Sequence, residues 1–185
     1  MSVVREEVLA VVEARVANEH LRRHMLACEA IMRALAVRFG EDADAWGLAG
    51  LAHDLDSEET ANDFTRHGAE AAGVLEGLGA APEVVHAVAA HNPATGIVGE
   101  TRMDVALIVA DQLSGLVTAA ALIRPDKQLA GVALKSVRKR YRETAFARGV
   151  DRASIARCSE IGLELDEALA LGLEAMQAIA PDLGL

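Results

Sequence analysis

Apolar residues recur along most of the chain at intervals of three and four positions, which is the spacing of one helical face. This pattern predicts helices over residues 3–17, 19–38, 42–53, 65–79, 82–91, 101–123, 126–130, 134–147, 151–160 and 163–179. Breakers separate several of them. Gly40 ends one helix, Pro82 suits the first turn of another, and Asn92 ends that helix because the residue before a proline resists the helical conformation. No alternating run of β-branched residues is long enough to predict a strand.

The composition supports an all-α fold. Of the 185 residues, 52% are hydrophobic but only 3% are aromatic, so Ala, Leu and Val must form the core. A chain of this length fits one domain. We therefore predict a single domain over residues 1–185, with a core of about 19–123 and a C-terminal helical region of about 124–185.

Net charge and cysteine content limit the binding partners and the cellular compartment that we expect. The formal charge of −10 argues against stable binding to nucleic acid. Cys28 and Cys158 lie far apart with no CxxC spacing, so we expect neither a disulfide framework nor a thiolate zinc site, and a reducing cytoplasm fits best. Charged residues interrupt the apolar N-terminal residues, and we expect no membrane segment.

Five polar residues interrupt the apolar stripes of five different predicted helices. They are His24, His53, His67, His91 and Asp111. A single histidine on an apolar face is most simply a satisfied core residue. Five together need a shared partner, because burying an unpaired imidazole or carboxylate costs a few kcal/mol or more. A divalent cation would serve, and nitrogen and oxygen ligands favour Mn, Fe, Co, Ni or Zn.

The sequence LAHDLDS adds Asp54 directly after His53. Adjacent residues on a helix point about 100° apart, so both can reach one ion only near a helix end. The apolar helix before His53 therefore ends at the predicted metal site.

The order His24, His53-Asp54 and Asp111 resembles the HD-domain superfamily of metal-dependent phosphohydrolases over roughly residues 19–123. RHG around His67 and AHN around His91 resemble the branch that holds two metal ions, which includes bacterial diadenosine tetraphosphate hydrolases. ALIVADQL matches the final Asp-bearing helix of that family. ADQLSGL lacks the Arg that closely follows the last Asp in those enzymes, so the resemblance does not fix the substrate.

The resemblance implies an HD-domain helical bundle that holds one or two divalent transition-metal ions. His24, His53, Asp54 and Asp111 would hold the first ion, and Asp54 would bridge to a second ion held by His67 and His91. His53 and Asp54 would be the catalytic pair. The implied reaction is hydrolysis, by metal-activated water, of a phosphoester or phosphoanhydride bond in a nucleotide or another small phosphorylated compound.

Residues around the six ligands are assigned from helical phase. Asp104 or Glu29 could orient the histidines, Asp56 is expected in a solvated loop, and Cys28 is expected to be a small core residue. The basic segment 134–152 is either a solvated helix face or a source of phosphate contacts over the metal site. The candidate substrate-binding residues are Asn92, Thr118, Arg124, Lys127, Lys135 and Lys139.

Two other functions remain open from the sequence. One is a catalytically silent HD-type binding or regulatory module, against which the complete ligand set argues. The other is a di-iron HD-type oxygenase, which uses the same ligand residues. The oligomeric state is also open, and a homodimer is possible.

Overall fold

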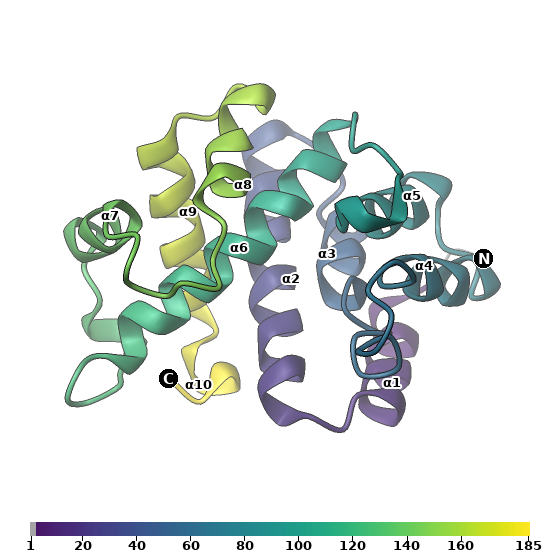
Figure 1. Cartoon of the computed structure of the whole chain (residues 1–185), viewed down its shortest axis with the longest axis horizontal. Coiled ribbons are helices and arrows are strands. Elements are labelled where there is room, and N and C mark those ends of the chain that lie inside the picture. The colour runs from purple at the N-terminus through teal and green to yellow at the C-terminus, as the bar shows by residue number, and fades with distance from the viewer. Residues whose placement is uncertain (1–2) are drawn as a thin grey trace.

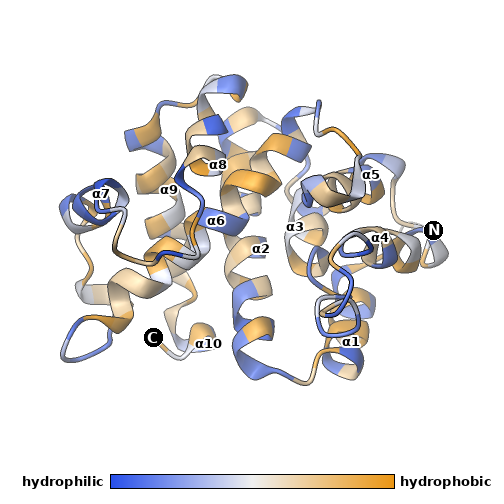
Figure 2. Cartoon of the chain, in the orientation of Figure 1, coloured by the Kyte–Doolittle hydropathy of each residue, from blue (hydrophilic) through white to orange (hydrophobic). Residues whose placement is uncertain are grey.

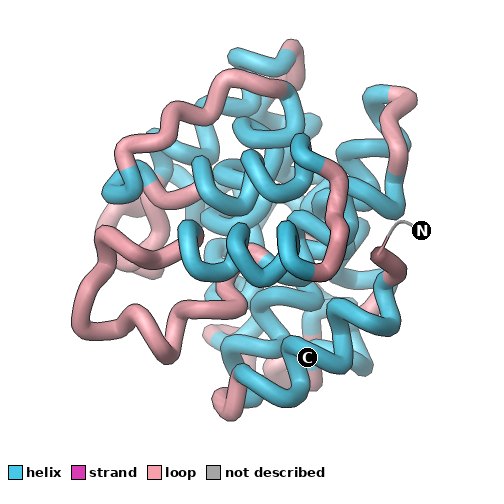
Figure 3. The backbone as a smooth tube through the Cα atoms, turned by 90° about the vertical axis from the view of Figure 1, so that its right-hand side faces the viewer, coloured by secondary structure: helices cyan, strands magenta, loops and turns pink. Residues whose placement is uncertain are grey.

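The computed structural model describes residues 3–185, and within that range the chain forms helices and no strand (Figures 1 and 3). The predicted all-α class is confirmed. In chain order the elements, with η marking short 3-10 helices, are α1 (Arg5–Arg15), α2 (Glu19–Phe39), α3 (Ala43–Ala52), α4 (Ala69–Gly77), α5 (Pro82–Ala90), η1 (Pro93–Thr95), α6 (Arg102–Leu122), η2 (Leu129–Gly131), α7 (Leu134–Arg142), α8 (Arg152–Ala156), η3 (Arg157–Ile161), α9 (Leu165–Ala178) and α10 (Ala180–Leu183).

Helices α2, α3 and α6 form the centre of the fold (Figure 1). Helix α3 packs along α2, and Gly50 makes the close approach possible, since a Cβ at Gly50 would lie 2.7 Å from the carbonyl carbon of Cys28. His24 lies one turn before Cys28, and His53 lies one turn after Gly50. The close packing therefore places their rings side by side, with centroids 5.1 Å apart.

Side chains cap the helices that carry the site residues. The Asn18 carboxamide oxygen accepts hydrogen bonds from the N–H groups of His20 and Leu21 at the start of α2. At the start of α6, Thr101 and Asp104 form a reciprocal capping box. Such caps satisfy N–H groups that a helix leaves unpaired at its first turn, so they fix where each helix begins.

Helix α4 begins at Ala69 rather than near Thr65. Residues 53–67 instead form a series of turns, and the carboxylate of Asp56 accepts hydrogen bonds from the N–H groups of Gly68 (2.8 Å) and Ala71 (2.9 Å). Gly68 has a φ of 88°, a conformation that favours glycine. These turns set the start of α4 and the position of His67.

The C-terminal part differs from the prediction in its helix boundaries. No α-helix covers 126–130, because the chain turns after Pro125 and forms only η2. Helix α7 ends at Arg142, so residues 143–151 form a loop instead of continuing a helix to 147. The predicted helix 151–160 is divided into α8 and η3, and α10 was not predicted. Helix α9 packs on both α2 and α6, so this region lies against the core.

Helix α6 is long and apolar enough, by length and composition, to cross a membrane. In the fold it is the central core helix, and 67% of its most apolar 18-residue window is buried against other helices. Figure 2 shows the contrast with α7, which is hydrophilic and lies at the edge of the molecule. The burial of α6 within the bundle accounts for its apolar sequence.

Candidate metal centre

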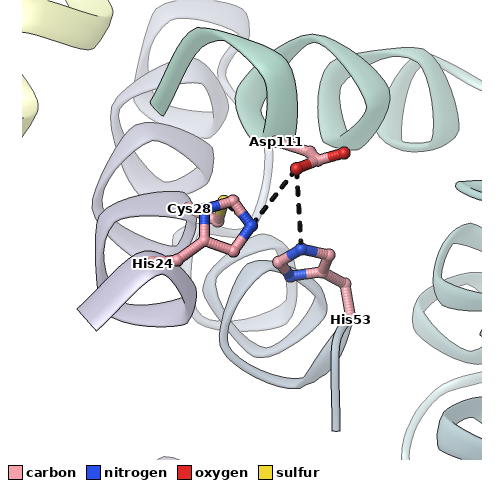
Figure 4. Close-up of side chains that lie close together, drawn as sticks. All are labelled: His24, Cys28, His53 and Asp111. Carbon is pink, nitrogen blue, oxygen red and sulfur yellow. Dashed lines mark hydrogen bonds and ion pairs between the residues drawn. The ribbon is translucent and has the colours of Figure 1, made fainter. Parts of the chain in front are cut away.

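Six side chains predicted to be ligands come together between α2, α3, α5 and α6. His24 lies in α2 and Asp111 in α6, while His53 and Asp54 directly follow α3. His67 lies just before α4, and His91 directly follows α5. Figure 4 shows the part of this group formed by His24, His53 and Asp111, with Cys28 beside it.

Each histidine has its Nδ1 atom engaged by a neighbour. His53 donates to the carbonyl of Gly50 (2.9 Å) and His91 to that of Val88 (2.6 Å), each one helical turn earlier. His67 Nδ1 donates to Asp56 Oδ1 (2.8 Å). His24 Nδ1 lies 2.9 Å from the Ser114 hydroxyl, which donates to the Asp111 carbonyl and is therefore free to accept from His24. In its neutral form, each of the four rings would therefore present an Nε2 lone pair as a potential metal ligand.

The Nε2 atoms converge on the carboxylates of Asp54 and Asp111. Asp54 Oδ1 lies 3.2 Å from His67 Nε2, 3.5 Å from His53 Nε2 and 3.7 Å from His91 Nε2. The other oxygen of Asp54 lies 3.6 Å from His24 Nε2, which is also 3.2 Å from Asp111 Oδ1. Asp54 Oδ1 therefore faces His53, His67 and His91, and its other oxygen faces His24, so this one carboxylate lies next to all four rings.

Two features show that this group fits a cation. His53 Nε2 is buried and has no hydrogen-bond partner among the described residues. The Nε2 atoms of His67 and His91 lie only 3.2 Å apart, although both rings donate from Nδ1. Two lone pairs at that distance repel each other unless a proton or a metal ion lies between them or beside them. A divalent cation would satisfy all of these atoms at once.

The pKa values of the aspartate and histidine side chains agree with a site in which ionised carboxylates need a nearby positive charge. Burial raises the pKa of Asp54, but nearby His53, His67 and His91 outweigh it and hold that pKa well below its usual range. Burial lowers the pKa of His67, yet its hydrogen bonds to Asp54 and Asp56 raise it to about 9. Burial lowers the pKa of His53, which keeps that ring neutral. Without metal, a proton on His67 supplies part of the positive charge.

Asp56 corrects one prediction. It does not lie in a solvated loop but is 1% exposed, and its carboxylate holds His67 Nδ1 and the first N–H groups of α4. No periodic signal distinguishes it in the sequence from the other acidic residues after Asp54. Asp104 and Glu29 do not orient the ligand histidines: Asp104 contacts His86, and Glu29 pairs with Arg5 and Arg33.

Three further residues support the ligands on α2 and α6. Gln112 donates from Nε2 to Asp111 Oδ2 (2.8 Å), and Ser114 contacts His24, as described above. Cys28 is buried and lies within ligand distance of His24, His53 and Asp111. Burial raises the pKa of its thiol, which points to Ser114 at 3.6 Å, so Cys28 is a neutral neighbour of the nitrogen and oxygen ligands. Gln112 and Ser114 were not predicted, because their roles depend on the loop and helix that face them.

The predicted substrate contacts are distributed differently. Asn92 is buried, and its amide donates to the carbonyls of Phe64 and His67, so it holds the loop that carries His67 instead of lining a pocket. Thr118 is half-buried on the face of α6 that carries Asp111. Its assignment as a substrate contact stays a prediction.

The four cations proposed as phosphate contacts do not reach the centre. Arg124 and Lys139 line a cavity of about 260 Å³ between α6 and α7, while Lys127 and Lys135 are exposed nearby in sequence. Arg124 follows Asp111 by thirteen residues, or about 20 Å of helix. Figure 1 shows α7 on the opposite side of α6 from α4 and α5. The sequence does not show where α7 packs, so it could not place these four cations relative to the centre.

The centre is open on one side. The side chains of His24 and Asp111 are 24% and 23% exposed, and that of Asp54 is 14% exposed, whereas that of His53 is fully buried. The edge formed by His24 and Asp111 is therefore the part of the centre that contacts solvent.

These features define an all-helical protein whose bundle contains a histidine and aspartate group able to hold metal. The family model of the HD domain matches residues 21–116, which is just over half of the chain. The chain therefore belongs to the HD-domain family. No curated protein and no solved structure matched the chain in the corresponding comparisons. The specific resemblance to the two-metal branch stays a prediction.

Proposed function

We propose that this protein is a metal-dependent phosphohydrolase that cleaves a phosphoester or phosphoanhydride bond in a nucleotide or another small phosphorylated compound. The observation that carries the proposal is the convergence of four imidazole Nε2 atoms on the ionised carboxylates of Asp54 and Asp111, in a group whose His24 and Asp111 side chains are partly exposed. Membership of the HD-domain family, a superfamily of metal-dependent phosphohydrolases, supports it.

The residues that would hold metal fall into two overlapping groups. His24, His53, Asp54 and Asp111 form one, and Asp54, His67 and His91 form the other. A divalent cation bound there would supply Lewis-acid chemistry, lowering the pKa of water and neutralising charge on a phosphate oxygen. The side chains fit Mn, Fe, Co, Ni or Zn, since the donors are imidazole nitrogen and carboxylate oxygen.

The protein's own residues fix the geometry around the reacting phosphate. The hydrogen bonds from Nδ1 of His53, His67 and His91 hold each ring in one tautomer and orientation. Asp54 and Asp111 are ionised near neutral pH because the histidines lower their pKa values. Asp54 Oδ2 lies on the side of partly exposed His24, which forms part of the edge that contacts solvent.

The test is phosphate release by protein loaded in turn with Mn, Fe, Co, Ni or Zn. Nucleoside monophosphates, diphosphates, triphosphates and dinucleoside polyphosphates would form the panel, with Asp54→Asn as the inactive variant. Asp166→Asn is the matched control, because Asp166 is an exposed carboxylate on α9 that pairs with Arg138. We expect release that Asp54→Asn abolishes and Asp166→Asn retains. Oxygen-dependent product formation without phosphate release would indicate the oxygenase, and no turnover of any kind would indicate the binding module.

A further inference from the structure

The loop that joins α7 to α8, residues 143–151, borders the metal centre, and we call it the strap. Figure 1 shows it lying across α6. At its end, the N–H of Asp151 donates to Gln112 Oε1 (2.7 Å), while Gln112 Nε2 donates to the ligand Asp111 (2.8 Å). Val150 lies against Gly115, one turn beyond Asp111 on the same face of α6. One amide side chain therefore connects the strap to a metal-ligand carboxylate.

Arg152 holds the strap in a defined shape. Its guanidinium donates to the carbonyls of Ala147 (2.6 Å) and Val150 (2.7 Å), and also to those of Glu143 and Phe146. Ala147 has a φ of 43°, in the left-handed region that a residue with a Cβ rarely adopts. Such strain persists where the surroundings fix the backbone, and it is concentrated at functional sites.

The strap leaves hydrogen-bond donors unused. In the described chain, the consecutive N–H groups of Ala147, Arg148 and Gly149 have no acceptor within the protein. Arg148 is exposed and makes no ion pair, and every other described arginine except Arg142 donates a side-chain hydrogen bond. Consecutive free N–H groups beside a left-handed residue form a concavity suited to an anion.

The metal centre itself lacks such donors. No Lys or Arg side chain is among the hydrogen-bond or ion-pair partners of its six ligand residues. The strap, which Gln112 connects to Asp111, carries a cation and three amide groups that would complement a phosphate group that the metal ligands leave uncompensated.

We propose that residues 147–149 of the strap form a phosphate-binding loop, with Arg148 as its cation, for a substrate phosphate group other than the one at the metal centre. The word substrate here rests on the proposed phosphohydrolase function. The binding site does not, because its chemistry requires only an anion with two phosphate groups. Preferred ligands then carry a second phosphate, as nucleoside diphosphates do.

The probes are non-hydrolysable analogues of ADP and AMP in which a P–CH2 link replaces the scissile P–O bond, titrated calorimetrically into metal-loaded protein. We expect the ADP analogue to bind about tenfold more tightly than the AMP analogue, because of the charge-assisted contacts to the second phosphate. Arg148→Gln should remove this preference, and Arg148→Lys should restore part of it. Arg142→Gln is the matched control, since Arg142 is equally unpaired but lies on α7, and it should leave the preference unchanged.

The result that would overturn the proposal is a preference that survives Arg148→Gln, or one that Arg142→Gln also removes. Because Arg148 is exposed and its side chain makes no hydrogen bond or ion pair within the described chain, its substitution should leave Tm unchanged, so loss of folding would not mimic loss of binding. The phosphate-binding loop and the phosphohydrolase function can be rejected separately. If the protein releases phosphate but Arg148→Gln keeps the preference for the ADP analogue, only the loop is rejected. If Arg148→Gln loses that preference but the protein releases no phosphate from any substrate, only the phosphohydrolase function is rejected.

Discussion

The metal centre and the cavity between α6 and α7 both gather charged side chains, yet they differ in how those charges are satisfied. In the cavity, Arg124 is held by Asp126 and the Gly131 carbonyl, and Arg140 pairs with Glu143. In the centre, the Nδ1 atoms have partners, whereas the Nε2 atoms face carboxylates and one another. Clustered charge alone therefore does not distinguish a candidate metal site. Imidazole nitrogens that the fold orients toward shared carboxylates do.

Among substitutions that test the difference between the metal centre and the cavity, we expect Asp54→Asn to have the largest effect on phosphate release. The Asp54 carboxylate faces all four histidines, so its neutralisation should reduce phosphate release by about a thousandfold or more, since both proposed ligand groups lose a charged oxygen. Steady-state kinetics on the best substrate of the panel would measure the loss. Activity within tenfold of the unmodified protein would show that Asp54 does not bridge the two groups.

A smaller loss is expected for Asp56→Asn, because Asp56 acts through His67. The substitution keeps the shape of the side chain but weakens its hold on His67 Nδ1. Partners of this kind typically contribute about 10–100-fold in metal affinity. Competition with a chelator would measure the affinity. An unchanged affinity, with kcat alone altered, would contradict the role assigned to Asp56.

The centre, unlike the cavity, should exchange protons when it binds metal. The pKa of about 9 for His67 means that the ring is protonated at pH 7 in the metal-free protein, and metal must displace that proton. Apparent affinity should therefore rise by about tenfold for each pH unit up to about 9. Calorimetry in two buffers of different ionisation enthalpy would count the released protons. If the number of protons released on metal binding at pH 7 were the same in His67→Gln as in the unmodified protein, His67 would not be the group that loses a proton.

The smallest effect is expected in the cavity. Because Arg124 and Lys139 pair with Asp126 and Glu143 and not with any ligand residue, Arg124→Gln and Lys139→Gln should change kcat/KM by less than about twofold, as exposed ion pairs contribute little. A tenfold or larger increase in KM for either variant would place the cavity in the substrate path and reverse the distinction drawn above.

The sequence predicted the helices of the core well because their apolar stripes and caps are local. His24, His53, His67, His91 and Asp111 could be singled out for the same reason, since each interrupts an apolar stripe. Asp56 could not, because its role arises only when the turns of residues 53–67 bring it against His67 and the start of α4. The same holds for Gln112, whose partner on the strap follows it by 39 positions.

The basic segment, residues 134–152, could be recognised in the sequence, but the structural role of its charges could not be predicted. Its charges are plain in the sequence, but only some of their partners are. Glu143 follows Arg140 by one helical turn, whereas Asp166, the partner of Arg138, lies 28 positions away on α9. Helical phase alone could not separate the paired Arg138 from the unpaired Arg148. That distinction required the path of the strap, which begins where the predicted helix 134–147 was expected to continue.

The most direct test of the central claim is the metal content per chain, measured by inductively coupled plasma mass spectrometry on protein purified without chelator. The account predicts two equivalents of a divalent transition metal, largely lost in Asp54→Ala and retained in Asp166→Ala. No bound metal, even after loading with Mn or Fe, would contradict the claim that the four converging Nε2 atoms and the two carboxylates form a metal centre.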